Sequence, residues 1–496
     1  MLPYQFEEEP TSACVTGYAG LLPYLDLACI LGVLQAADEK IGICGPQGWM
    51  DRHFVLSLSL LNLAGGECVE DIRMLEADPG LCRIAGEAEK YGLSRQQRRS
   101  LERRFRRGRT RTFPSETRLY EWLNAFHDPS QEQYRVPGKA FIPAKNAHLL
   151  GLDQVNTDLV ASVQRHRPTK TATLDIDATV QETHKREALF CYLKCRAYQP
   201  LNVRWAETGL MLRSQFRDGN VPAGYGTLEI IKESLSVLPP GVEKIMMRID
   251  SAGYQHEVLR FCATGDEGRR PVIEFTVSND MTVEFRKAVE GVAESEWKPL
   301  PGGKQEWAEV VYVPEAIAHS KHDPDYRYLA IREELEQGLL PGMEETQPQL
   351  DLPFAWVVMG KRGYRLSGVA TNREGDGAEL IHWHRERCGK SEEAHAILKG
   401  DLAGGILPSG KFGANAAWWA IVVLAYNLQV AMQLLALPGP LTKKRMKALR
   451  FALISAPGRV MQRGRQLFVR LGRGHPALEW LREMRRLISG LAAAPA

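Results

Sequence analysis

Two predicted strands of this chain end in aspartates. Residues 171–179 alternate apolar side chains with Asp175 and Asp177, and residues 244–250 close on Asp250. A period of two is typical of a strand whose polar positions share one face. Asp177 lies nearer than Asp175 to the carboxyl end of its strand, where binding sites in open α/β sheets gather. We therefore select Asp177, with Asp175 as the alternative.

A third acid, Glu392, lies in residues 389–399, whose composition favours a helix. Glu393 is its alternative, and Lys399 lies two helical turns after Glu392 on the same face. Two strand-end aspartates and a helix-borne glutamate supply the oxygen ligands that hard divalent cations prefer. We predict that Asp177, Asp250 and Glu392 are catalytic residues that hold two metal ions. Such a site suits in-line displacement at a phosphodiester, with Lys399 contacting a nearby phosphate.

Basic residues are concentrated in segments, although the formal net charge of the 496-residue chain is only +3. Residues 95–111 contain nine arginines and one acid, Glu102. A solvated helix face is the simple interpretation, but so many cations repel one another unless a polyanion neutralises them. We therefore favour contact with the backbone of double-stranded DNA, which would position the protein without reading bases. The predicted contacts are Arg98, Arg99, Arg103, Arg104, Arg106 and Arg107. The carboxy-terminal region from Lys443 onward adds further cations.

The chain exceeds one ordinary core, so several domains are expected. Strands near 171–179, 189–193 and 210–213 precede a helix, a strand, a helix and a strand, which is the order of a ribonuclease H-like α/β core. The predicted division is a helical amino-terminal region (1–127, DNA-binding), a connector interrupted by Pro and Gly (128–168), the core in two parts (169–294 and 366–437), a β-rich insertion between them (295–365) and a basic helical carboxy-terminal region (438–496).

Four other interpretations are disfavoured. The nine cysteines show no paired framework, which favours a reducing cytoplasm. Cys191 and Cys195 with His184 lack a second Cys/His pair, so core cysteines are favoured over a zinc site. Residues 412–437 carry no charge, but Asn and Gln side chains interrupt their apolar run, so a buried helix is favoured over a membrane span. The acidic amino terminus has no secretory pattern.

The chain resembles DDE transposases of the IS1380 group, within the IS4-like class, nearly from end to end. The matching stretches are residues 62–67 with 70–71, 113–115 with 117, 174–177 with 179, 248–254, 389–392, 401–405, and 407–415 with the tryptophan pair that follows. The resemblance implies a ribonuclease H-like core, a β insertion between the second aspartate and the glutamate, and Mg²⁺-dependent cut-and-paste transposition, with Mn²⁺ as a substitute. Asp177, Asp250 and Glu392 fall on the acid triad of the family.

The IS4-like class also carries a Tyr-x2-Arg-x3-Glu-x6-Lys signature around its glutamate. Glu392 and Lys399 keep the last spacing of that signature, but Cys388 stands where the arginine is expected and Arg385 where the tyrosine is expected. Arg387 lies one residue away from the arginine position. We take Arg387 as the candidate for the arginine role at the DNA.

The favoured function is an insertion-sequence transposase that binds terminal inverted repeats and target DNA. It is expected to act as a homodimer in a paired-end complex, in the bacterial cytoplasm at the nucleoid, without a membrane. Two alternatives stay open: a metal-dependent nuclease that never joins DNA, and a domesticated DNA-binding protein without catalysis. The presence of all three acids argues against the second alternative.

Overall fold

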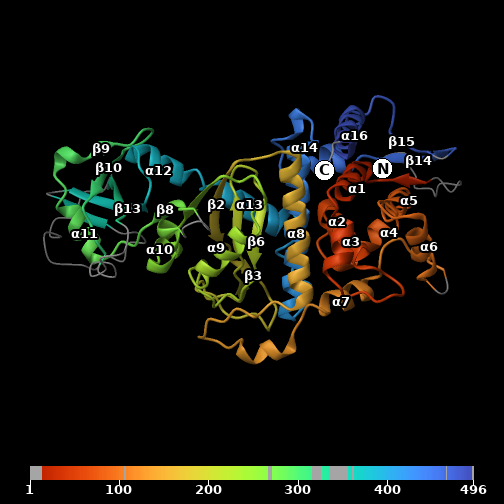
Figure 1. The fold of residues 1–496 in the computed structure, drawn as a ribbon, viewed down its shortest axis with the longest axis horizontal. Helices are drawn as coiled ribbons and strands as arrows, with labels where there is room; N and C mark the ends of the chain where they lie inside the picture. The colour runs from red at the N-terminus through yellow and green to blue at the C-terminus, as the bar shows by residue number, and fades with distance from the viewer. Residues whose placement is uncertain are drawn as a thin grey trace, which may run out of the picture.

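The structure is a computed structural model that describes residues 14–105, 108–265, 271–314, 325–335, 356–359, 362–464 and 466–493. The molecule is elongated, with a large sheet in the middle, amino-terminal helices at one end and a group of antiparallel strands at the other (Figure 1). The carboxy-terminal segment returns to the amino-terminal helices, so the first and last described residues lie in one part of the molecule.

One mixed sheet organises the centre of the molecule. β2 (Thr171–Ala178) lies between β5 (Leu201–Trp205), which is antiparallel to it, and β7 (Lys244–Ile249), which is parallel. β6 (Met211–Gln215) pairs antiparallel with β5, and β8 (Glu274–Ser278) pairs parallel with β7. The order β6-β5-β2-β7-β8 therefore places β2 at the centre. Parallel strands covered on both faces are typically buried, as the apolar side chains of β2 are.

The second strand of this sheet differs from the prediction. The sequence placed it near residues 189–193, but the structure places it at β5, whose first residues are buried. Residues 189–193 belong instead to a short excursion in which Phe190 forms an isolated antiparallel bridge with Arg196. β3 (Gln181–Glu182) and β4 (Ala197–Tyr198) pair at the base of this excursion. Its aromatic residues satisfied the strand pattern but lie exposed beyond the core.

The strands that follow β8 extend the same sheet. They are β9 (Lys298–Pro299), β10 (Gln305–Val310), β11 (Arg327–Glu334), β12 (Trp356–Met359) and β13 (Arg362–Thr371). β13 pairs antiparallel with β8, and the remaining strands continue outward from β13. The β-rich segment and the central strands therefore share one continuous hydrogen-bonded sheet.

Helices cover the sheet and connect it to the amino-terminal region. They include α9 (Thr227–Ser236), α10 (His256–Thr264), α11 (Val283–Glu290), α12 (Gly377–Arg385), α13 (Lys390–Ala396) and α14 (Phe412–Leu435). α14 is long and apolar enough to cross a membrane by composition, but 78% of its most apolar window is buried inside the protein. Its polar Asn427 is fully buried and bonds to Met211 of β6 and to Asn156. Amides that interrupt the apolar run therefore attach α14 to its neighbours.

The predicted connector contains a long helix. α8 (Ala147–His166) is 20 residues long, begins after Asn146, whose side chain accepts from the Leu149 amide, and packs along α14 (Figure 1). Gly151 lies within α8 at its contact with α2, where a Cβ atom would come within 2.0 Å of the Lys40 carbonyl oxygen. The glycine that suggested a break therefore permits close packing instead.

The amino-terminal helices are α1 (Leu22–Ile30), α2 (Val33–Lys40), α3 (Asp51–Ala64), α4 (Ile72–Glu76), α5 (Pro79–Ala88), α6 (Arg95–Arg103) and α7 (Glu116–Asn124). The carboxy-terminal region was predicted to be helical, but it also contains strands. β14 (Gly458–Arg463) and β15 (Gln466–Arg470) form a hairpin between α15 (Met446–Leu449) and α16 (Ala477–Ala493). Gly464, with φ of +60°, allows the turn. β14 also pairs with β1 (Val15–Thr16), and α16 packs on α1.

Candidate active site

Asp177 and Asp250 lie side by side at the carboxyl ends of two adjacent parallel strands. The last registered pair between β2 and β7 is Ile176 with Ile249, and each aspartate follows its isoleucine directly. Asp250 begins the short helical turn Ser251–Gly253, and its carboxylate accepts a hydrogen bond of 3.0 Å from the Ala252 amide. Parallel pairing thus brings together two acids that are far apart in the sequence.

Asp175, the alternative to Asp177, is held by an ion pair within the sheet. Arg248 donates to both of its carboxylate oxygens, at 2.7 and 3.0 Å, and the side chain of Arg204 lies 3.6 Å away. Asp175 is only 1% exposed, whereas the side chain of Asp177 is 20% exposed. The two aspartates share a strand but have different environments. The carboxylate of Asp175 is buried and paired with arginines, whereas the carboxylate of Asp177 is partly exposed to solvent.

The third acid lies on α13, which faces the end of β2. Gly389, with φ of +78°, precedes the helix, and the exposed Glu392 side chain accepts a hydrogen bond from the Gly389 amide. One turn later, His395 Nδ1 lies 3.9 Å from Asp177 Oδ2. Since residues three apart on a helix are neighbours, Glu392 and His395 lie on the side of α13 that is next to Asp177.

The pKa of Asp177 reflects its burial first and the neighbouring charges second. Burial raises this pKa, the positive charge of Arg387 opposes the rise, and the carboxylates of Asp250 and Glu392 add to it, which gives a value of about 6. Burial together with nearby Lys399 lowers the pKa of His395 to about 4, so its imidazole is neutral at physiological pH. The three predicted acids are therefore close enough to interact electrostatically.

These acids do not form a closed cation site in this conformation. Across the described ranges, no group of three or more His, Cys, Asp and Glu side chains is placed to hold one metal ion. The carboxylates of Asp250 and Glu392 are instead turned to the backbone amides of Ala252 and Gly389. The donor set nevertheless fits a hard divalent cation, because it consists of carboxylate oxygens whose mutual repulsion a cation would relieve.

Two predicted basic residues lie at this site. Lys399 is in a π-helical turn (Ile397–Asp401) that continues α13, and its Nζ donates to the Val180 carbonyl at 3.1 Å, just beyond β2. Burial lowers the pKa of Lys399. Arg387 is half-buried, its charge acts on Asp177, and its Nε atom is buried without a hydrogen-bond partner. Both cations therefore lie beside the acids.

The arginine-rich segment divides into two parts. In α6, the only buried side chain is that of Leu101, and Arg98, Arg99 and Arg103 are exposed. Arg106 and Arg107 lie outside the residues that the structure describes. The first part of the segment thus presents cations to solvent.

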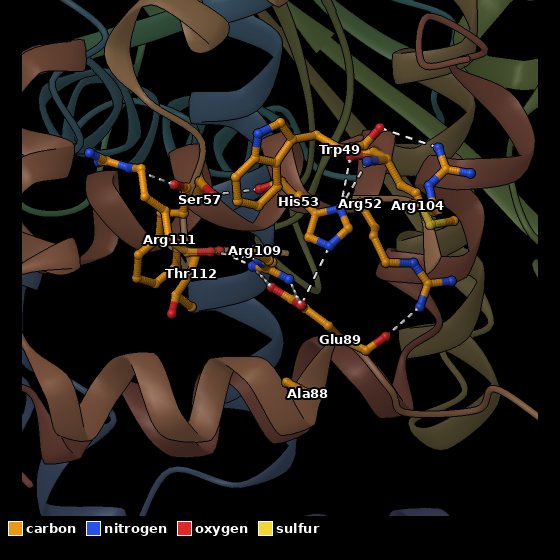
Figure 2. Close-up of polar contacts among 12 residues, drawn as sticks. Trp49, Arg52, His53, Ser57, Ala88, Glu89, Arg104, Arg109, Arg111 and Thr112 are labelled. Carbon is orange, nitrogen blue, oxygen red and sulfur yellow. Dashed lines mark hydrogen bonds and ion pairs between the residues drawn. The ribbon is translucent and has the colours of Figure 1, made fainter. Parts of the chain in front are cut away.

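The second part is bound into the protein (Figure 2). Arg104 donates to the backbone carbonyls of Gly48 and Trp49, among others, and is half-buried. Arg109 bonds to the carboxylate of Glu89 through both terminal nitrogens and lies 4.5 Å above the Trp49 ring. The guanidinium of Arg104 is therefore already engaged within the fold, and the expected contact of Arg104 with DNA stays a prediction.

A buried ion pair is the centre of this second part. Glu89 is 4% exposed, and its carboxylate lies 3.4 Å from His53 Nε2 as well as against Arg109. Burial alone would raise the pKa of Glu89, but hydrogen bonds from Arg109 and His53 outweigh burial and lower it. No sequence pattern predicts this arrangement, because Glu89 and His53 lie on different helical segments with no motif in common.

Sequence reasoning also missed two arginines of the central sheet. Arg248 lies two residues before Asp250 in β7 and binds Asp175, while Arg204 lies opposite Asp175 in β5. The alternation of β7 placed Arg248 and Asp250 on one face, which was the available signal for the first of them.

The chain matches a transposase family in sequence and aligns with a solved transposase structure. Residues 52–493 match the family described as "Transposase DDE domain group 1". No curated protein matches the chain in sequence. A solved structure described as a cryo-EM structure of the piggyBac transposase synaptic complex with hairpin DNA aligns with a TM-score of 0.41 and 9% identity, over 96% of this chain and 85% of that one. Because the family match spans most of its length, the chain belongs to the DDE transposase domain group 1 and is a DNA transposase.

Proposed function

We propose that this transposase belongs to an insertion sequence of the IS1380 group and performs cut-and-paste transposition. It would bind the terminal inverted repeats, cleave the ends of the element and join the 3′ ends to target DNA. The observation that carries this proposal is the position of Asp177 and Asp250 at the ends of the paired parallel strands β2 and β7, with His395 of the helix that bears Glu392 3.9 Å from Asp177. Three carboxylates from separate elements that repel one another are suited to share divalent cations.

A ribonuclease H-like core is part of this proposal. The support is the strand order β6-β5-β2-β7-β8, in which three antiparallel strands are followed by two parallel ones with helices α9 and α10 between them. In such a core the first strand is central and carries the first acid, as β2 carries Asp177.

Asp177, Asp250 and Glu392 would hold Mg²⁺, or Mn²⁺ in its place. Bound there, the divalent cations would activate the attacking oxygen and stabilise the leaving oxygen of the phosphodiester. Glu392 is exposed and needs only to leave the Gly389 amide to join the aspartates. A hydrogen bond to a charged group contributes about 1.5–3 kcal/mol, a cost that cation binding would offset.

The protein side chains would position the DNA. Lys399 and Arg387 lie beside the acids and would neutralise phosphate charge near the cut. His395 is neutral and lies 3.9 Å from Asp177, where it would orient that carboxylate. The exposed Arg98, Arg99 and Arg103 of α6 would contact the DNA backbone farther away.

The proposed reaction also bears on the oligomeric state of the protein. Two ends must be cut and joined together, so we propose a homodimer that holds both ends in a paired complex at the nucleoid. A nuclease without strand transfer is the second candidate, because the same acids would support hydrolysis alone.

The test uses the inverted repeats that bracket the gene. Labelled, pre-cleaved ends incubated with the full chain, Mg²⁺ and a target plasmid are expected to give joined products. Asp250→Ala should abolish cleavage and joining, whereas Glu379→Gln, an exposed acid on α12, should retain both. Label confined to hydrolysed products would reject transposition, and cleavage by Asp250→Ala at the wild-type rate would reject the site.

A further inference from the structure

A second site adjoins the candidate active site on the opposite side of α13. It is a pocket of 460 Å³ between the end of β5, α13, α14 and the segment 442–446, which leads into the first residue of α15. We call it the α13–α14 pocket. None of Asp177, Asp250 and Glu392 lines it, so it is distinct from the acid cluster.

The lining of the pocket is rich in positive charge. Five cationic residues line it and two acidic ones. The cations are Arg204, Lys390, Lys443, Lys444 and Arg445, and the acids are Glu207 and Glu393. Lys390, Lys443 and Lys444 are exposed and make no ion pair with the described residues. The carboxylate of Glu207 already accepts from the amide and hydroxyl of Thr173, at 2.8 and 2.6 Å.

Buried donors in the pocket lack partners. Gln429 of α14 is 5% exposed, its Oε1 accepts from the Tyr24 hydroxyl, and its Nε2 has no hydrogen-bond partner. The Nε and Nη1 atoms of Arg204 are also buried without hydrogen bonds, although Nη1 lies 3.6 Å from Asp175. A buried donor left without a partner destabilises the protein. The natural partner for such donors, beneath a rim of lysines, is an anion.

The pocket lies close to the acid cluster. Arg204 and Asn202 alternate along β5, and they lie opposite Asp175 and Asp177 of β2 in register. Arg204 is therefore one strand repeat, about 7 Å, from the level of the acid cluster. The same helix, α13, carries Glu392 toward the acids and Lys390 toward the pocket.

We propose that the α13–α14 pocket binds a phosphate group of the DNA backbone close to the phosphodiester that is cut. Gln429 and Arg204 hold the phosphate oxygens, and Lys390 and the segment 443–445 neutralise its charge. The inference rests on the proposed function in that DNA is the substrate. It adds a second fixed point for the strand, which sets the position of the scissile bond against the acids.

The sharpest test is Gln429→Glu. This substitution keeps an oxygen for the Tyr24 hydroxyl but replaces the free amide by a negative charge that repels phosphate. Binding of the full chain to a duplex of about 40 base pairs is measured over a range of salt concentrations. Each lost phosphate contact lowers the slope of log K against log salt by about 0.9. We expect a loss of about one contact for Gln429→Glu and more for Lys443→Ala/Lys444→Ala/Arg445→Ala.

A control separates the pocket from net charge. Arg482→Ala/Arg485→Ala/Arg486→Ala also removes three positive charges, but from exposed positions of α16 that do not line the pocket. This variant should keep the wild-type slope. Unchanged affinity and slope in Gln429→Glu would overturn the inference. If wild-type chain is stabilised by inorganic phosphate and Gln429→Glu is not, while DNA binding is equal, the pocket binds free phosphate and the proposal is wrong. Failure of wild-type protein to bind or cleave DNA would instead overturn the proposed function.

Discussion

Replacing Asp177 by asparagine should stabilise the metal-free protein while abolishing activity. The pKa of Asp177 is raised from 3.8 to about 6. A shift of roughly 2 units corresponds to about 3 kcal/mol. Above pH 6 the folded chain must carry this carboxylate ionised in an unfavourable place, whereas the unfolded chain ionises it freely. Asp177→Asn removes that cost.

The pH dependence has a definite sign. At pH 7.5 the variant is expected to unfold at the higher temperature, by about 3 °C, since a chain of 496 residues shifts by about 1 °C per kcal/mol. The difference should decline as pH falls through 6 and vanish below about 4, where Asp177 is protonated in both states. Thermal unfolding in a chelator measures this directly.

Asp175→Asn is the matched control two residues earlier on the same strand. It removes the Asp175 carboxylate from the buried Arg248, which keeps its ion pair with Glu386, and should destabilise the protein by up to about 3–5 kcal/mol. Saturating Mg²⁺ should stabilise the wild type and not Asp177→Asn, because binding to the folded state adds stability by mass action. A midpoint for Asp177→Asn at or below the wild-type midpoint at pH 7.5 would refute the reasoning about crowded charge.

Two further outcomes are expected in the amino-terminal region. Arg98→Ala/Arg99→Ala/Arg103→Ala should lower the salt slope of DNA binding by up to about 3, measured by filter binding, with unfolding unchanged; an unaltered slope would show that α6 does not touch DNA. Arg109→Met should destabilise the chain by about 3 kcal/mol in urea at pH 7.5 because Glu89 is buried and loses its main donor. Since hydrogen bonding lowers the pKa of Glu89 despite its burial, this loss should shrink as pH falls below about 4; an equal loss at both pH values would contradict the ionic interpretation.

Local patterns in the sequence predicted several elements of the centre well. The alternation in residues 171–179 and 244–250 identified β2 and β7, and the long apolar run identified α14. These signals are local, because the period of the apolar residues reports which side chains face the core. Residues 189–193 have the composition of a strand but lie outside the central sheet, so the strand predicted there was wrong.

Features that depend on pairing between distant segments were beyond such reasoning. The sequence does not state that β13 pairs with β8, or that Arg248 bonds to Asp175. For the same reason the function of each arginine in residues 95–111 was not separable, since Arg104 and Arg98 have the same local surroundings. The structure distinguishes them: Arg98 is exposed and donates to the nearby Leu93 carbonyl, whereas Arg104 is half-buried and donates to carbonyls of the distant segment 45–49.

The pairing of β1 with β14 has a consequence for how the protein is made. The first described strand meets its partner only after almost the whole chain has been synthesised. During synthesis the amino-terminal helices therefore lack the contacts with β14 and α16 until those elements have been translated. Premature termination anywhere before that hairpin would leave this end of the molecule incomplete, so a truncated gene copy yields a chain open to proteolysis rather than a shortened, folded competitor for the same DNA.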